Sequence, residues 1–180
     1  RFRLYEFYVA DSSEELESKI LNSNYVAKGN IDHTSPKSTL VILPISVKGR
    51  FVALRSLNHD TFGTCAEFNL YRDPYSPSPT PMQYFIDESK DKFWKDYKLD
   101  RTGWTATANS EHTTNSGNEG PISNILDGNS ATLWHSKYGG GGTGWHDERP
   151  SSSDPFQFTI DLGSEKYFKA FSYMPRTSGD

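Results

Sequence analysis

The stretch Phe156-Gln157-Phe158-Thr159-Ile160-Asp161-Leu162 alternates between apolar and polar side chains. Successive side chains of a β-strand point to opposite faces, so this alternation predicts a strand with one face in a hydrophobic core. Runs of strand-forming residues predict further strands at residues 2–9, 51–57, 65–71, 104–108 and 166–173, and the continuous apolar run at 39–43 predicts a strand in the core. Turns are expected at 47–50 and at Gly163, and one short helical turn at 14–17. Many short strands with almost no helix predict an all-β fold, arranged as a β-sandwich.

The composition excludes several classes of protein. A length of 180 residues suits one domain, and the net charge of −4 argues against an electrostatic nucleic-acid binder. No apolar run is long enough to span a membrane. The single cysteine, Cys65, excludes an internal disulfide and a cysteine-rich zinc site, and we expect a buried thiol. Because the chain opens on Arg1 rather than Met, it is interpreted as a fragment or a processed piece.

The composition changes after Asp73. Four prolines fall within residues 74–81, which predicts an extended, semi-rigid linker. Residues 82–100 mix aromatic and charged side chains, and they either form a short helix that packs on the domain or continue the linker. The chain is therefore divided into 1–73, a linker at 74–100, and 101–180.

The stretch 123–138 combines a tight acidic turn with aromatic side chains. Asp127-Gly128-Asn129 is a turn signal, because glycine accepts positive φ and Asp and Asn side chains bond to nearby backbone. Such a turn is either an Asx-turn alone or part of a loop that wraps a hard cation. Trp134, like Trp104 upstream, is expected in the core, whereas His135 and Tyr138 are expected to be exposed.

The chain resembles the discoidin family, which includes the type C domains of coagulation factors V and VIII and the bacterial family-32 carbohydrate-binding modules. Residues 103–111, 123–138 and 156–163 resemble the first half of that domain. Residues 3–9, 49–54 and 65–71 resemble its second half. The resemblance implies a discoidin-like jelly-roll β-sandwich of the galactose-binding-domain type, with its halves in permuted order. We expect the halves to complete one sandwich, within one chain or by exchange between chains; the alternative is that they belong to tandem modules.

The same resemblance implies a shallow sugar site in the loops at one end of the sandwich. His135 and Tyr138 match its polar and aromatic pair, Arg176 its hydroxyl-binding arginine, and Phe62 its second aromatic wall. The Asn that usually follows the arginine is missing before Asp180. The expected ligands are terminal galactose, N-acetylgalactosamine or N-acetylglucosamine on glycans. The alternatives are an adhesion module that binds protein or lipid, and a structural spacer.

A structural calcium ion is also implied by the resemblance. It would lie against the acidic turn and join the two halves of the chain. The implied ligands are the carboxylates of Asp127 and Glu67, the hydroxyl and carbonyl of Thr132, and the carbonyls of Ile125, Asn129 and Ala66. Carboxylates with neutral oxygens suit calcium rather than zinc.

Catalysis has little support in the sequence. His146, Asp147 and Glu148 form a cluster, and paired carboxylates can hydrolyse glycosides, but a solvated Gly-rich loop is the better interpretation. Trp145 and His146 are weaker candidates for an extension of the sugar site. The chain is therefore predicted to be a non-catalytic module that targets an attached secreted enzyme, such as a glycoside hydrolase, to glycans. Its expected location is extracellular, on a cell surface or periplasmic.

Overall fold

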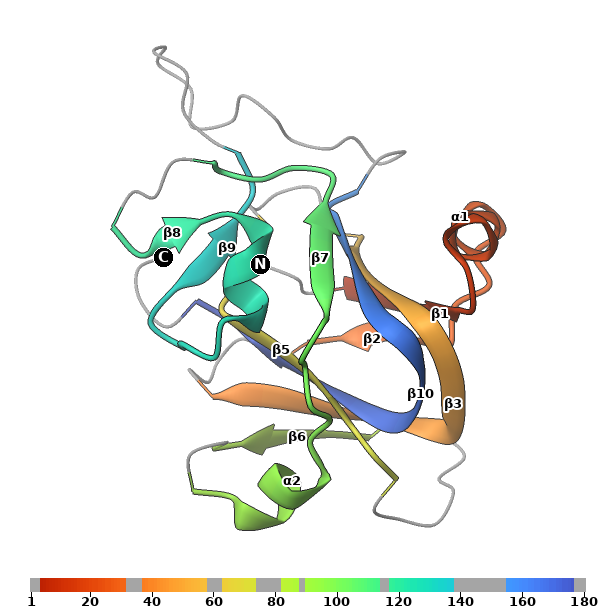
Figure 1. Ribbon diagram of the computed structural model, residues 1–180, viewed down its shortest axis with the longest axis horizontal. Coiled ribbons are helices and arrows are strands. Elements are labelled where there is room, and N and C mark those ends of the chain that lie inside the picture. The colour runs from red at the N-terminus through yellow and green to blue at the C-terminus, as the bar shows by residue number, and fades with distance from the viewer. Residues whose placement is uncertain are drawn as a thin grey trace.

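The computed structural model describes residues 4–31, 37–57, 63–73, 82–87, 90–113, 117–137 and 155–176. Antiparallel strands dominate these ranges, which confirms the predicted all-β class (Figure 1). The strands are β1 Leu4–Ala10, β2 Ala27–Asn30, β3 Ser38–Ser56, β4 Thr64–Cys65, β5 Glu67–Tyr71, β6 Met82–Ile86, β7 Thr105–Ala108, β8 Glu119–Gly120, β9 Leu133–His135 and β10 Gln157–Met174. The helices are α1 Ser13–Leu21, α2 Lys92–Tyr97 and the 3₁₀ helix η1 Ile122–Leu126.

Two long, bent strands, β3 and β10, pair with each other and form the centre of the larger sheet. The predicted turn at 47–50 and the predicted strand end at Gly163 are wrong, because the chain stays in the sheet at both places. The pairing shifts register between Asp161 and Lys166, where Gly163 adopts a φ of +73°. A glycine with positive φ lets the strand bend while its neighbours remain paired. At Gly49 there is no room for a side chain, since an added Cβ would lie 2.5 Å from Cγ1 of Val9.

The bends divide this sheet into two half-sheets that pack face to face. The first half-sheet has the order β2-β1-β3-β10-β7, and the second has the order β6-β3-β10-β5. Phe7 of β1 lies with its ring centre 6.4 Å from that of Phe68 on β5, across the two half-sheets. Phe171 of β10 contacts both rings, at 4.5 and 5.7 Å. The hydrophobic core therefore lies between the half-sheets, as in a β-sandwich.

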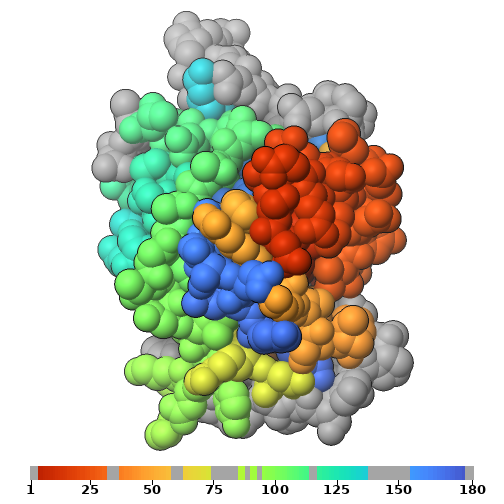
Figure 2. All heavy atoms as spheres, turned by 45° about the vertical axis from the view of Figure 1, so that its right-hand side comes forward, coloured from red at the N-terminus to blue at the C-terminus, as the bar shows by residue number. Residues whose placement is uncertain are grey.

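Segments from both ends of the chain share the larger sheet. Strand β10 lies between β3 and β5, and β7 pairs with the first part of β10. Figure 2 shows β3 (orange) and β10 (blue) side by side on one face, beside the red N-terminal segment. Of the segment predicted as linker, β6 instead pairs with β3, and α2 takes the helical alternative. The Pro-rich residues 74–81 lie outside the described residues.

Helix α1 is longer than the short turn expected at 14–17. The hydroxyl of Ser12 accepts a hydrogen bond from the Glu15 amide at 3.2 Å and caps the first turn. Leu16 packs with Tyr8 and Ala53 on the outer face of the first half-sheet. Among the described residues, no helix combines the length and the apolar character needed to cross a membrane.

Candidate functional site

A second, smaller sheet carries one end of the proposed sugar site. Its order is β4-β9-β8, with β9 antiparallel to β4 and parallel to β8. Trp134, in the middle of β9, is fully buried, and its indole N–H donates to the carbonyl of Ser110 at 3.0 Å. Trp104 is also buried in the core, and so is the Cys65 thiol. The predicted burial of these three side chains is therefore confirmed, and Trp134 anchors β9 to the sandwich.

His135 follows Trp134 in β9, and its expected exposure is wrong because it is only 3% exposed. β9 is the middle strand of the small sheet, and Nδ1 of His135 donates to the carbonyl of Ser136 at 2.6 Å. Burial lowers the pKa of His135 below its usual 6.5, because the charged ring would lose its hydration. At neutral pH the ring is therefore uncharged.

Arg176, just beyond β10, forms an ion pair with Glu119 of β8, with Nη2 2.8 Å from Oε1. Both side chains are partly buried, at 23% and 10% exposure, and the charges of both act on His135. Sequence reasoning missed Glu119, since no motif surrounds it. Only the pairing of Glu119 with Leu133 in the parallel β8–β9 ladder brings it to this end of the sheet.

Phe62 and Tyr138, the two proposed aromatic walls, lie outside the described residues, as do Trp145 and the cluster at 146–148. The backbone next to both walls is described. The Ser136 amide donates to the carbonyl of Gly63 at 2.8 Å, and the Gly63 amide donates to the Ser136 hydroxyl at 3.1 Å. Gly63, just before β4, and Ser136, just after β9, are therefore neighbours in space.

The acidic turn at the end of η1 has the predicted Asx-turn geometry. Oδ1 of Asp127 accepts from the Asn129 amide at 2.7 Å, and Gly128 adopts a φ of +80°. The Thr132 hydroxyl lies 2.6 Å from Oδ2 of Asp127 and 2.8 Å from the carbonyl of Asn129. Three of the proposed calcium ligands therefore form one hydrogen-bonded turn.

Two of the remaining proposed ligands, the Glu67 carboxylate and the Ile125 carbonyl, contact a guanidinium group, whereas the Ala66 amide donates to the carbonyl of Met174 at 2.8 Å. Nη1 of Arg101 lies 2.5 Å from Oε2 of Glu67 and donates to the carbonyl of Ile125 at 3.2 Å. Burial raises the pKa of Glu67, and the bond from Arg101 opposes that rise. Glu67 and the Ile125 carbonyl do not fit a calcium ion while Arg101 is in this position, because a positive nitrogen already contacts both.

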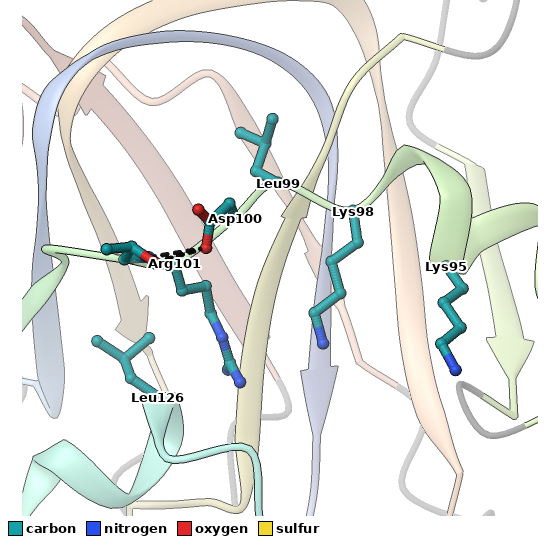
Figure 3. A pocket seen from close by; sticks show the side chains of 7 residues that line it. Lys95, Lys98, Leu99, Asp100, Arg101 and Leu126 are labelled. Carbon is teal, nitrogen blue, oxygen red and sulfur yellow. Dashed lines mark hydrogen bonds between the residues drawn. The ribbon is translucent and has the colours of Figure 1, made fainter.

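A hollow of about 550 Å³ opens beside Arg101 (Figure 3). In this view the side chains of Lys95, Lys98 and Arg101 extend toward the same side. The hollow is lined by Lys95, Lys98, Leu99, Asp100, Arg101, Thr102 and Leu126. Arg101 and Lys95 of α2 both line it.

The fold and these side chains define an all-β sandwich with an Arg–Glu pair at one end and a buried Arg–Glu cluster beside η1. The chain matches no protein-family model and no curated protein. Within the described residues, no group of three or more His, Cys, Asp or Glu side chains is placed to hold a metal ion.

Proposed function

We propose that this protein is a non-catalytic carbohydrate-binding module with a discoidin-like jelly-roll fold. Its proposed ligands are terminal galactose, N-acetylgalactosamine and N-acetylglucosamine. The observation that carries the proposal is the ion pair between Arg176 and Glu119 beside His135, at the end of the small sheet. These residues are far apart in the chain, and strand pairing gathers them at one place.

The chemistry of the pair suits sugar hydroxyls. A guanidinium offers only donors and an ionised carboxylate only acceptors, whereas each hydroxyl can do both. Two neighbouring hydroxyls on a pyranose can therefore accept from Arg176 and donate to Glu119. Because Glu119 already holds the guanidinium in place, less side-chain entropy is lost on binding. His135 holds this end of β9 in position, and the aromatic platform is assigned to Phe62 and Tyr138.

A shallow site of this kind binds weakly, with a Kd between about 10 μM and the millimolar range. Weak binding serves a module that holds an attached enzyme near a surface rich in glycans. The proposed setting is therefore outside the cell or in the periplasm, with the module as an ancillary part of a secreted glycoside hydrolase or a similar enzyme.

Amide chemical shifts during titration with the three sugars test the proposal. We expect saturable shifts at Glu119, His135 and Arg176 with at least one sugar. Arg176→Lys keeps the charge but loses the planar donor pair, so affinity should fall at least about tenfold. Arg72→Lys is the matched control, because Arg72 follows β5 and bonds to the backbone of α2, and it should leave affinity unchanged.

Two results would contradict sugar binding. The first is an absence of shifts with every sugar and on a glycan array. The second is equal affinity of the Arg176→Lys protein and the wild type. Co-sedimentation with phosphatidylserine vesicles in the absence of any sugar response would instead favour the lipid-binding alternative.

A further inference from the structure

One arginine lies where oxygen atoms of two separate elements converge. Arg101 belongs to the segment between α2 and β7. Its Nη1 lies 2.5 Å from Oε2 of Glu67, 3.2 Å from the carbonyl of Ile125 and 3.3 Å from that of Phe68. Glu67 and Phe68 belong to β5, and Ile125 to η1, so a single nitrogen joins the sandwich to the acidic turn.

The acidic turn at 127–129 lies next to the other terminal nitrogen of the guanidinium, Nη2. Nη2 of Arg101 lies 3.6 Å from the position that a Cβ on Gly128 would take, and the charge of Asp127 acts on Glu67. The side chains of Arg101 and Glu67 are 14% and 7% exposed. One carboxylate and two carbonyls thus contact a positive charge that is mostly buried, and oxygens of these kinds are the ligands of a hard cation.

We propose that Arg101 is the resident cation of this site and takes the structural place of a bound metal ion. A carboxylate as buried as Glu67 requires a positive partner, because an unpaired buried charge is strongly destabilising. Arg101 supplies that charge from within the chain and fixes η1 against β5. The wild-type protein therefore needs no calcium here, in contrast to the ion implied by the resemblance.

Without the guanidinium, the same oxygens should become available to a metal ion. Oε1 of Glu67 is buried and has no hydrogen-bond partner among the described residues. Arg101 lines the neighbouring hollow, so its removal should give solvent a path to this oxygen, to Oε2 and to the carbonyl of Ile125. Calcium binds six to eight oxygens, including carboxylates, carbonyls and water. Removal of Arg101 should therefore turn a guanidinium site into a calcium site.

The wild-type protein gives the first test and needs no variant. Protein purified from a calcium-containing medium should carry less than about 0.1 calcium per chain by mass spectrometry, because the site holds an arginine. Its Tm should be the same in calcium and in a chelator. Stoichiometric calcium, or a Tm that falls in the chelator, would overturn the proposal.

The second test compares Arg101→Ala with Lys95→Ala. Lys95 lines the same hollow and has no ion pair among the described residues, so this control removes one positive charge without touching Glu67. Arg101→Ala should lower the Tm by about 6 to 15 °C, and Lys95→Ala by less than about 2 °C. Calcium at about 100 times its Kd should raise the Tm of Arg101→Ala alone, by about 5 to 10 °C.

The rescue should depend on the carboxylate of Glu67. Adding Glu67→Gln to Arg101→Ala should abolish the calcium-induced rise in Tm. An undiminished Tm in Arg101→Ala, or no calcium response in that variant, would overturn the proposal. If Arg101→Ala does not fold, Arg101→Gln is tested in the same way, and the wild-type measurements decide the metal content independently.

Discussion

At the scale of single residues, His135 and Arg101 show what the sequence does not reveal. A histidine after a buried tryptophan alternates to the other face of its strand, and that face was expected to be exposed. In the structure all three residues of β9 are buried, so both faces of the strand are covered and His135 is buried as well. Arg101 lies in a charged stretch without any motif. Its importance depends on backbone carbonyls that converge in space, and side-chain patterns carry no information about them.

The buried His135 predicts a pH dependence of stability. The folded pKa is lowered by burial, so the unfolded chain binds the proton more tightly. The contribution to stability is therefore present above the unfolded pKa of 6.5 and is lost as the pH falls through the folded pKa. We expect the free energy of unfolding to decrease from about pH 7.5 to about pH 5.5.

Urea unfolding across this pH range measures the effect. His135→Asn keeps a donor near the position of Nδ1 but does not titrate, so the decrease should be smaller in this variant. The same substitution at His112, a partly exposed histidine, is the control and should keep the wild-type slope. An unchanged slope in His135→Asn would contradict this assignment.

At the scale of elements, the strand positions were predictable and their continuity was not. Alternation predicts a strand at residues 2–9, and Tyr5, Phe7 and Val9, which share one face of β1, all lie in the core. The sequence predicts a turn at 47–50 and the end of a strand at Gly163, and both places contain a glycine. In the structure each glycine instead permits a bend inside a paired strand. Whether a glycine ends or bends a strand depends on the neighbouring strands.

The bend in β3 predicts a cost for any side chain at residue 49. A Cβ there would lie 2.5 Å from Cγ1 of Val9 and 2.8 Å from the carbonyl oxygen of Ala10, so β1 would have to move. Gly49→Ala should reduce the free energy of unfolding by about 1 to 3 kcal/mol. Lys48→Ala, which changes an exposed neighbour, is the control in the same urea titration. Equal stability of Gly49→Ala and the wild type would show that β1 adapts without cost.

At the scale of the whole molecule, one sheet unites distant parts of the chain. Strand β10 pairs with β3 over most of its length and with β5 near its end. Composition and alternation were enough to predict a sandwich, but the order of the strands was not, because pairing partners leave no local mark in a single sequence. The permuted relation to the discoidin domain stays a prediction.

This arrangement predicts that neither part of the chain folds alone. A fragment of residues 1–73 lacks β10, the strand that lies between β3 and β5. Without β10 the second half-sheet is incomplete, and the core is left partly uncovered on that side. We expect a poorly dispersed amide spectrum for this fragment and recovery of the native spectrum when residues 74–180 are added. The intact chain should be a monomer that unfolds in one cooperative step. A fragment of 1–73 with native dispersion by itself would contradict the prediction.

The position of β10 also has a consequence for biosynthesis. Every other described strand precedes it in the chain, yet with β3 it forms the centre of the larger sheet. While the ribosome is still translating the earlier segments, β3 and β5 have unpaired edges, and exposed edges favour association with other nascent chains. The native sheet can close only after residues 157–174 have left the exit tunnel. Slowing translation before residue 157 should therefore prolong dependence on chaperones rather than improve folding.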